Sequence, residues 1–108
     1  MTRTYYRIVT AAPPPVEDFA SDAALGIPPP IDDPIRFRLH DGISVYATET
    51  QARNKARAFT DFGAYLARLE IPDDAPIRVE RTLNSRGHHT LWGDAEAIRR
   101  CVVDVLAV

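Results

Sequence analysis

Short segments in which apolar and polar residues alternate, or in which aromatic and β-branched residues concentrate, recur along the whole chain. Such segments are typical of β-strands, because successive side chains of a strand point to opposite sides of the sheet. The last segment is the most continuously apolar, which predicts a central strand. Asn-Ser-Arg-Gly at 84–87 separates two of the segments and predicts a hairpin turn. The strands expected on this basis are residues 3–10, 43–47, 65–71, 77–83, 88–92 and 101–108.

Apolar residues at helical spacing predict helices over residues 16–25 and 49–60, and a single helical turn over 95–100. Thr48, followed three residues later by Gln51, is a capping box that starts the second helix. Asp94 is suited to cap the last turn. The secondary structure of residues 35–40 is ambiguous from the sequence. Their alternation favours a strand, whereas Asp33-Pro34 before them and Gly42 after them are typical of a short helix.

The order of these elements predicts one α+β domain that spans residues 1–108. We expect a mostly antiparallel, twisted sheet with two short-to-medium helices, because the second half contains a hairpin rather than strand-helix-strand repeats. A chain of 108 residues leaves no room for a second domain. Residues 13–34 contain seven of the nine prolines and five acidic residues, and we expect them to form a Pro-rich, acidic insertion with a short helix.

Charge and cysteine content exclude several classes of protein. The formal net charge of −2 argues against a dedicated nucleic-acid-binding protein, although residues 35–69 carry six basic and three acidic residues. The ordinary role of the basic positions Arg53, Lys55 and Arg57 is a solvated helix face. A single cysteine, Cys101, cannot form an internal disulfide or a Cys-rich zinc site. Without a long apolar run or a secretion signal, we expect a cytoplasmic protein that does not span a membrane.

Four of the expected strands carry one face that mixes aromatic and hydrogen-bonding side chains. If these faces converge, they line a cleft that suits an anionic, partly planar ligand such as a nucleotide. The residues that share a face within each strand are Tyr5 with Arg7; Ser44 with Tyr46, followed by Thr48; Arg78 with Glu80 and Thr82; and His88 with Thr90 and Trp92.

Structural alternatives exist for most of these positions. Tyr46 can be a half-buried packing residue with a solvated hydroxyl, Trp92 can be a core residue, and Glu80 can form a surface ion pair with Arg78 or Arg81. His88 and His89 point to opposite faces of a strand, so they do not predict a metal site. Serine-hydrolase chemistry has no sequence support, because Ser44 lacks the context of a nucleophile elbow.

Three segments together resemble a known family. They are Tyr5-Tyr6-Arg7, the strand-to-helix passage from Gly42 to Thr48, and the strand Tyr65 to Pro72. In this order they are similar to the compact ADP-ribosyltransferase-type fold, a group that includes NAD-consuming toxins of bacterial toxin–antitoxin pairs.

The resemblance implies a role for several residues. Arg7 would hold the phosphate or ribose of NAD, and Tyr46 would pack on the nicotinamide with Thr48 nearby. The catalytic carboxylate would be Glu80 or Asp94, the latter in a late acidic region that also contains Glu96. The remaining expected contacts to NAD come from Tyr5, Ser44, His88, His89 and Trp92.

The resulting hypothesis is a domain that transfers ADP-ribose from NAD, or hydrolyses NAD, without a metal. It would act on a protein target or be paired with a cognate partner protein. The alternative is a non-enzymatic interaction domain of the antitoxin, immunity or regulatory type. In that case the Pro-rich segment 13–34 would present Phe19 and Leu25 to a partner.

Overall fold

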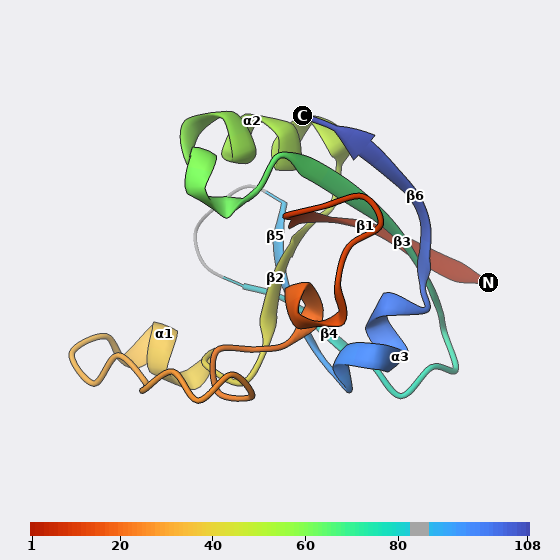
Figure 1. Ribbon diagram of the computed structural model, residues 1–108. Helices are drawn as coiled ribbons and strands as arrows, with labels where there is room; N and C mark the ends of the chain where they lie inside the picture. The colour runs from red at the N-terminus through yellow and green to blue at the C-terminus, as the bar shows by residue number, and fades with distance from the viewer. Residues whose placement is uncertain (83–86) are drawn as a thin grey trace.

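The structure is a computed structural model that describes residues 1–82 and 87–108. Its strands form one sheet with the order β4-β5-β2-β1-β3-β6, in which every pair of neighbours is antiparallel (Figure 1). The expected α+β domain with an antiparallel sheet is therefore confirmed. The strands are β1 (Thr2–Val9), β2 (Ile43–Tyr46), β3 (Tyr65–Pro72), β4 (Arg78–Arg81), β5 (His88–Trp92) and β6 (Val102–Ala107). The hairpin turn expected at 84–87 lies almost wholly outside the described residues.

Strand β1 lies in the middle of the sheet, but its two neighbours pair with it very differently. All eight of its residues are in register with β3, from Thr2 opposite Pro72 to Val9 opposite Tyr65. Its register with β2 is limited to one pair, Tyr6 opposite Tyr46. The two strands therefore diverge after this pair, and this local opening of the sheet positions the site described below.

Each face of the sheet buries its own apolar cluster. The larger cluster includes Phe19 of the 3-10 helix η1 (Val16–Phe19) and Ile98 of α3 (Ala95–Arg99), which cover one face. The other face is covered by α2 (Glu49–Ala58), whose Ala52 and Ala56 pack on side chains of the sheet. The first cluster centres on Val9, Val45, Ala67, Leu69, Ile71 and Leu91, and the second on Ile8, Tyr46 and Leu66.

Local capping signals define the helices well. The Thr48 hydroxyl accepts a hydrogen bond from the Gln51 amide at the start of α2, and the Asp94 carboxylate accepts one from the Ala97 amide at the start of α3. Residues 35–40, for which the sequence allowed either a strand or a short helix, overlap with the helix α1 (Pro34–Arg38). Its N-cap Asp33 accepts a hydrogen bond from the Arg36 amide. The expected helix over 16–25 is wrong beyond Phe19. The residues that follow are largely exposed, and without an apolar face to bury a helix there gains little stability.

Strand β6 lies at an edge of the sheet, so its expected central position is wrong. It pairs only with β3, and Val103 is 53% exposed. Its β-branched residues fit a strand, and both of its faces are only partly covered, by contacts of Val105 on one side and Leu106 on the other. The opposite edge is β4, which is shorter than the expected strand.

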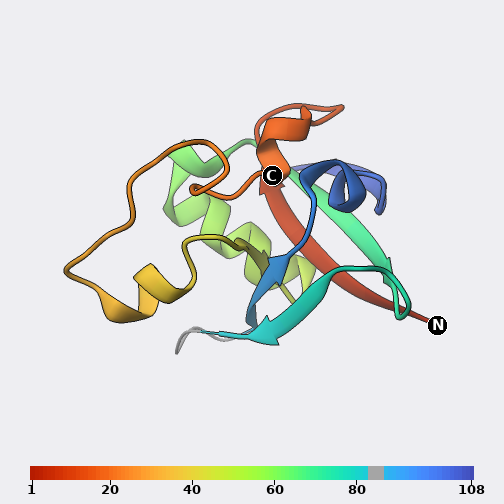
Figure 2. The ribbon, with the colours of Figure 1, turned by 90° about the horizontal axis from the view of Figure 1, so that it is seen from below.

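Segment 20–42, which contains α1, projects from the body of the protein in both views (Figures 1 and 2). It is bonded mainly to itself. The Ala23 amide donates to the His40 carbonyl, and His40 Nε2 lies 2.6 Å from the Ile27 carbonyl oxygen. Two of its charged residues, Asp22 and Arg36, nevertheless line the cavity described in the next section. Among the helices that the structure describes, none has the length and apolar character required to span a bilayer.

Candidate functional site

A cavity of about 340 Å³ opens where β1 and β2 diverge. Its walls come from the two strands, from α2, from η2 (Thr60–Phe62) and from the projecting segment. Ile8, Tyr46 and Phe62 supply its apolar surface. The polar side chains that line it are Arg7, Asp22, Arg36, Ser44, Lys55 and His88. We refer to it as the Arg7 cavity. A smaller cavity of about 170 Å³ shares Asp22, Arg36, Ser44 and His88 with it and extends beneath the projecting segment.

Arg7 reaches the cavity through the gap in the sheet. Alternation along β1 places it with Tyr5 and Val9, on the face covered by η1. Its Nε donates to the Asp18 carbonyl oxygen at 3.0 Å, and its Nη1 donates to the Ser44 carbonyl oxygen at 2.7 Å. These bonds tie the guanidinium to the backbone of η1 and of β2, on either side of the gap.

The charge of Arg7 is retained at this position. Burial lowers the pKa of its guanidinium, while the nearby Asp18, Tyr46 and Asp22 raise it. An arginine remains protonated in proteins even when its pKa falls. The cavity therefore contains a fixed positive charge whose remaining N–H groups can donate to an anion.

Tyr46 is part of the cavity wall and is almost completely buried. Only 5% of the residue is exposed, and it packs with Ile8, Ala52 and Leu66. Its ring meets the His88 ring edge-on, with 5.5 Å between centroids. Burial raises the pKa of the phenol, which keeps it neutral. The structure thus brings Tyr46 and Arg7 to one cavity, but it leaves no open ring face on which a nicotinamide can stack.

A chain of hydrogen bonds links β2, β5 and the end of β4. Ser44 Oγ lies 3.0 Å from His88 Nε2. His88 Nδ1 lies 3.2 Å from the Thr82 carbonyl oxygen and 2.9 Å from Thr82 Oγ1, which in turn lies 2.6 Å from Thr90 Oγ1. Ser44 pairs with Thr90 and Tyr46 pairs with His88, so Ser44 and His88 are diagonal neighbours on one face of the sheet.

The Arg7 cavity carries more positive than negative charge. Arg7, Arg36 and Lys55 line it, and Asp22 is the one carboxylate among the described residues that does so. Lys55 lies over the Phe59 ring, with 4.5 Å between Nζ and the ring centroid. Arg36 is also paired with Asp33 at 3.4 Å, an exposed contact that weakens its charge only slightly. Clustered cations next to a partly apolar wall are typical of sites for small anions.

Tyr5, His89 and Thr48 do not line the Arg7 cavity. Tyr5 packs on the core beneath η1, where its ring lies 5.1 Å from that of His89. Both belong to the opposite face from Tyr46, because β1 and β5 alternate. Thr48 caps α2, and its hydroxyl accepts the Gln51 amide at 3.2 Å.

Glu80 and Trp92 lie beyond the cavity, at the edge of the sheet. Glu80 forms exposed ion pairs with Arg38 and Arg78, each at 3.7 Å. The Trp92 indole N–H donates to Asp41 at 2.8 Å, and the Arg78 guanidinium stacks on its ring at 4.1 Å. The surface ion-pair alternative for Glu80 is therefore what the structure shows.

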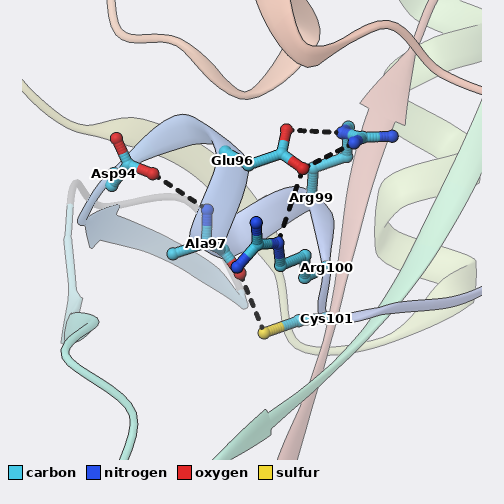
Figure 3. A network of polar contacts seen from close by, with 6 residues as sticks. All are labelled: Asp94, Glu96, Ala97, Arg99, Arg100 and Cys101. Carbon is cyan, nitrogen blue, oxygen red and sulfur yellow. Dashed lines mark hydrogen bonds and ion pairs between the residues drawn. The ribbon is translucent and has the colours of Figure 1, made fainter.

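The late acidic residues lie at the start of α3 (Figure 3), which is on the side of the molecule away from α1 (Figure 1). The Asp94 carboxylate accepts the Ala97 amide at 3.1 Å. Glu96 accepts Arg99 Nε at 2.9 Å and pairs with Arg100 at 3.5 Å. Asp94 thus caps the start of α3, and Glu96 is paired with arginines at its C-terminal end. Neither carboxylate lines the Arg7 cavity.

Cys101 follows α3 and does not line the Arg7 cavity. Its thiol donates to the Ala97 carbonyl oxygen at 3.5 Å (Figure 3). Burial raises the pKa of the thiol, which makes it a poor nucleophile. Over the described ranges 1–82 and 87–108, no cluster of three or more histidine, cysteine, aspartate or glutamate side chains is arranged to hold a metal ion.

Sequence reasoning missed Asp22, Arg36 and Phe62, and it treated Lys55 only as part of a basic helix face. These residues come from the projecting segment, α2 and η2, whose placement depends on tertiary contacts. The local excess of basic residues over 35–69 pointed to Arg36 and Lys55, whereas no sequence signal pointed to Asp22 or Phe62.

Comparison of the chain with family models, with curated proteins and with solved structures finds no match.

His88 makes the stability of the fold depend on pH. Burial lowers the pKa of this imidazole, and the cations Lys55 and Arg36 act in the same direction. Below a pH of about 6.5 the unfolded chain binds a proton that the folded protein does not, so the free energy of unfolding falls as the pH is lowered. The expected slope is up to about 1.4 kcal/mol per pH unit from this one group. Urea unfolding of the wild type and of His88→Gln between pH 7.5 and 5.5 measures it. An identical pH dependence in the two proteins would contradict the assignment.

Proposed function

We propose that the protein binds a small anionic ligand of the nucleotide class in the Arg7 cavity, with its phosphate on Arg7. The observation that carries this proposal is the double hydrogen bond from Arg7 to the Asp18 and Ser44 carbonyls, which fixes a guanidinium at the cavity wall. A guanidinium held in this way loses little conformational freedom when it binds a phosphate. Lys55 and Arg36 add positive charge from two other elements.

The size of the cavity limits the ligand. A volume of about 340 Å³ lies at the lower end of the range of small-molecule sites. This size suits a mononucleotide, or the phosphate-bearing part of a dinucleotide such as NAD. The smaller adjoining cavity, lined by Arg36, Ser44 and His88, offers room for a further group.

Transfer of ADP-ribose from NAD, or hydrolysis of NAD, is the enzymatic form of this proposal. Such a reaction needs a carboxylate near the ribose to stabilise its developing positive charge. Glu80 and Asp94 are engaged elsewhere, so we assign this position to Asp22, which lines the Arg7 cavity. Release of nicotinamide from NAD by the wild type but not by Asp22→Asn would support this form.

Replacement of Lys55 gives the clearest test of binding, because its side chain lines the Arg7 cavity from α2. We expect calorimetric titration with ADP-ribose at low salt to show binding that weakens as salt is added. Lys55→Ala should lower the affinity about tenfold, the effect of one lost charge-assisted contact.

The matched control is Arg57→Ala, which removes a cation of the same helix that does not line the Arg7 cavity. It should leave the affinity unchanged. Equal losses in the two variants would indicate nonspecific attraction to the basic helix. Failure of ADP-ribose, NAD and AMP to bind the wild type would overturn the proposal.

Exposed apolar residues on the projecting segment favour the interaction domain as a second candidate. Ile31 is 79% exposed, and Ile35 and Phe37 are each more than half exposed. Phe19 is buried in the core, so it is wrong as a contact residue, whereas Leu25 is half exposed. Binding of a co-encoded partner protein that is lost in an Ile31→Asp, Phe37→Asp double variant would support this candidate.

A further inference from the structure

The Ser44 hydroxyl faces a histidine that is oriented as a base. Ser44 Oγ lies 3.0 Å from His88 Nε2, and the opposite ring nitrogen, Nδ1, lies 3.2 Å from the Thr82 carbonyl oxygen. With the imidazole proton on Nδ1, the Thr82 carbonyl oxygen accepts it and Thr82 Oγ1, 2.9 Å from Nδ1, donates instead to Thr90 Oγ1; we assign this tautomer, which leaves the lone pair of Nε2 directed at Ser44. Nucleophile, base and orienting group are thus arranged in the order found in acyl-transfer enzymes.

The surroundings hold the imidazole in this orientation and in its neutral form. His88 is 4% exposed, and the edge of its ring packs on Tyr46. Burial lowers its pKa, as do Lys55 and Arg36 across the cavity and the adjacent His89, whereas the contact with Thr82 opposes them. A neutral imidazole can accept a proton at pH 7. Ser44 itself is exposed and lines both cavities, so its hydroxyl is open to a substrate.

Positive charge lies next to the hydroxyl. The Arg7 guanidinium is bonded to the carbonyl of Ser44 itself, and Lys55 and Arg36 line the same cavity. Attack of a hydroxyl on an ester carbonyl converts the carbonyl oxygen to an oxyanion, which nearby fixed cations stabilise. The same cations favour a substrate that carries a carboxylate or phosphate elsewhere.

We propose that Ser44 is a nucleophile activated by His88, with Thr82 as its positioning residue, and that it cleaves small esters bearing an anionic group. Ser44 Oγ bonds to the ester carbonyl carbon as its proton passes to His88 Nε2. The bond to the alcohol then breaks, and the departing oxygen takes that proton. The oxygen of a water that gives a proton to His88 Nε2 then bonds to the acyl carbon, the bond from that carbon to Ser44 Oγ breaks, and Oγ takes the proton back from His88 as the acid leaves. The preference for anionic esters rests on the proposed anion binding, whereas the reactivity of Ser44 does not.

A neutral alkyl fluorophosphonate tests the nucleophile directly. Attack by Ser44 forms a bond from Oγ to phosphorus and breaks the phosphorus–fluorine bond, so fluoride leaves and His88 takes the hydroxyl proton. We expect mass spectrometry to find one adduct, located on Ser44. The rate should rise with pH as the imidazole loses its proton. Labelling should vanish in Ser44→Ala and fall at least tenfold in His88→Gln.

The control serine is Ser21, whose hydroxyl accepts a hydrogen bond from the Ala24 amide and is bonded to no histidine within residues 1–82 and 87–108. Ser21→Ala should be labelled like the wild type. The thermal unfolding of each variant is measured in parallel. If His88→Gln fails to fold, Ser44→Ala still decides the test, because Ser44 is exposed and its replacement should leave the fold intact. No adduct on Ser44 at millimolar probe, or equal rates in the wild type and a folded His88→Gln, would overturn the proposal.

Ester hydrolysis separates this inference from the proposed function. We expect 4-nitrophenyl hemisuccinate to be cleaved with a kcat/KM at least tenfold above that of 4-nitrophenyl acetate, and Lys55→Ala to remove the difference. Labelling of Ser44 without ADP-ribose binding would overturn only the anion site. Binding of ADP-ribose by an unlabelled Ser44 would overturn only the nucleophile.

Discussion

Replacement of Gly63 by alanine should destabilise the protein more than any other single change at a glycine. Gly63 has φ of 145° and ψ of 166°, a conformation that side-chain-bearing residues rarely adopt. A Cβ there would also overlap the Val9 carbonyl at the end of β1. The two effects together should lower the free energy of unfolding by about 3 kcal/mol and the melting temperature by about 10 °C or more. Urea and thermal unfolding measure both.

Gly26 is the matched control for this prediction. It also has a positive φ, 78°, but a Cβ there would meet no atom within 4 Å. Gly26→Ala should therefore cost only the backbone penalty, about 1–2 kcal/mol. If the two variants lose equal stability, the close approach of Gly63 to Val9 does not contribute.

Replacement of Arg7 by methionine should affect both binding and stability. The variant removes the two hydrogen bonds to Asp18 and Ser44 and the charge that Arg7 places at the cavity wall. We expect ADP-ribose affinity to fall about a hundredfold, which corresponds to about 2.7 kcal/mol. The free energy of unfolding should fall by about 2 kcal/mol, because two carbonyl groups lose a charged donor.

Arg3→Met controls for the loss of an arginine from the same face of β1. Arg3 pairs with Asp73 at 3.6 Å, and both side chains are about half exposed. Such an ion pair contributes little, so stability should change by less than about 0.5 kcal/mol and ligand affinity should stay the same. Retention of ADP-ribose binding in Arg7→Met would contradict the assignment of the phosphate site.

The strands and helix starts could be predicted because they depend on local signals. Alternation gave β5 with its observed bounds, and the caps Thr48 and Asp94 placed the starts of α2 and α3. Alternation also correctly placed Ser44 with Tyr46, and His88 with Thr90, on shared faces. The same rule failed to show that Arg7 reaches these residues, because it does so through a gap in the sheet rather than across one face.

The remaining features depend on contacts between distant segments. The bond from Ser44 to His88 follows from the pairing of β2 with β5, which no local pattern specifies. For the same reason the sequence around Ser44 gives no sign of this contact: it lacks a nucleophile elbow, and the histidine next to its hydroxyl belongs to a neighbouring strand. Asp22 and Arg36 lie in a segment whose large apolar residues are mostly exposed, so its position depends on few core contacts that the sequence could indicate.

The residues around the Arg7 cavity are drawn from positions 7 to 88, from strands, helices and the projecting segment alike. No fragment of the chain can assemble it alone, so occupancy is coupled to cooperative folding rather than to any local unit. A ligand at a hundred times its dissociation constant would then add about 2.7 kcal/mol to the free energy of global unfolding. Hydrogen exchange would slow together in amides of β1, β2 and β5, far apart in the chain, once the ligand is bound.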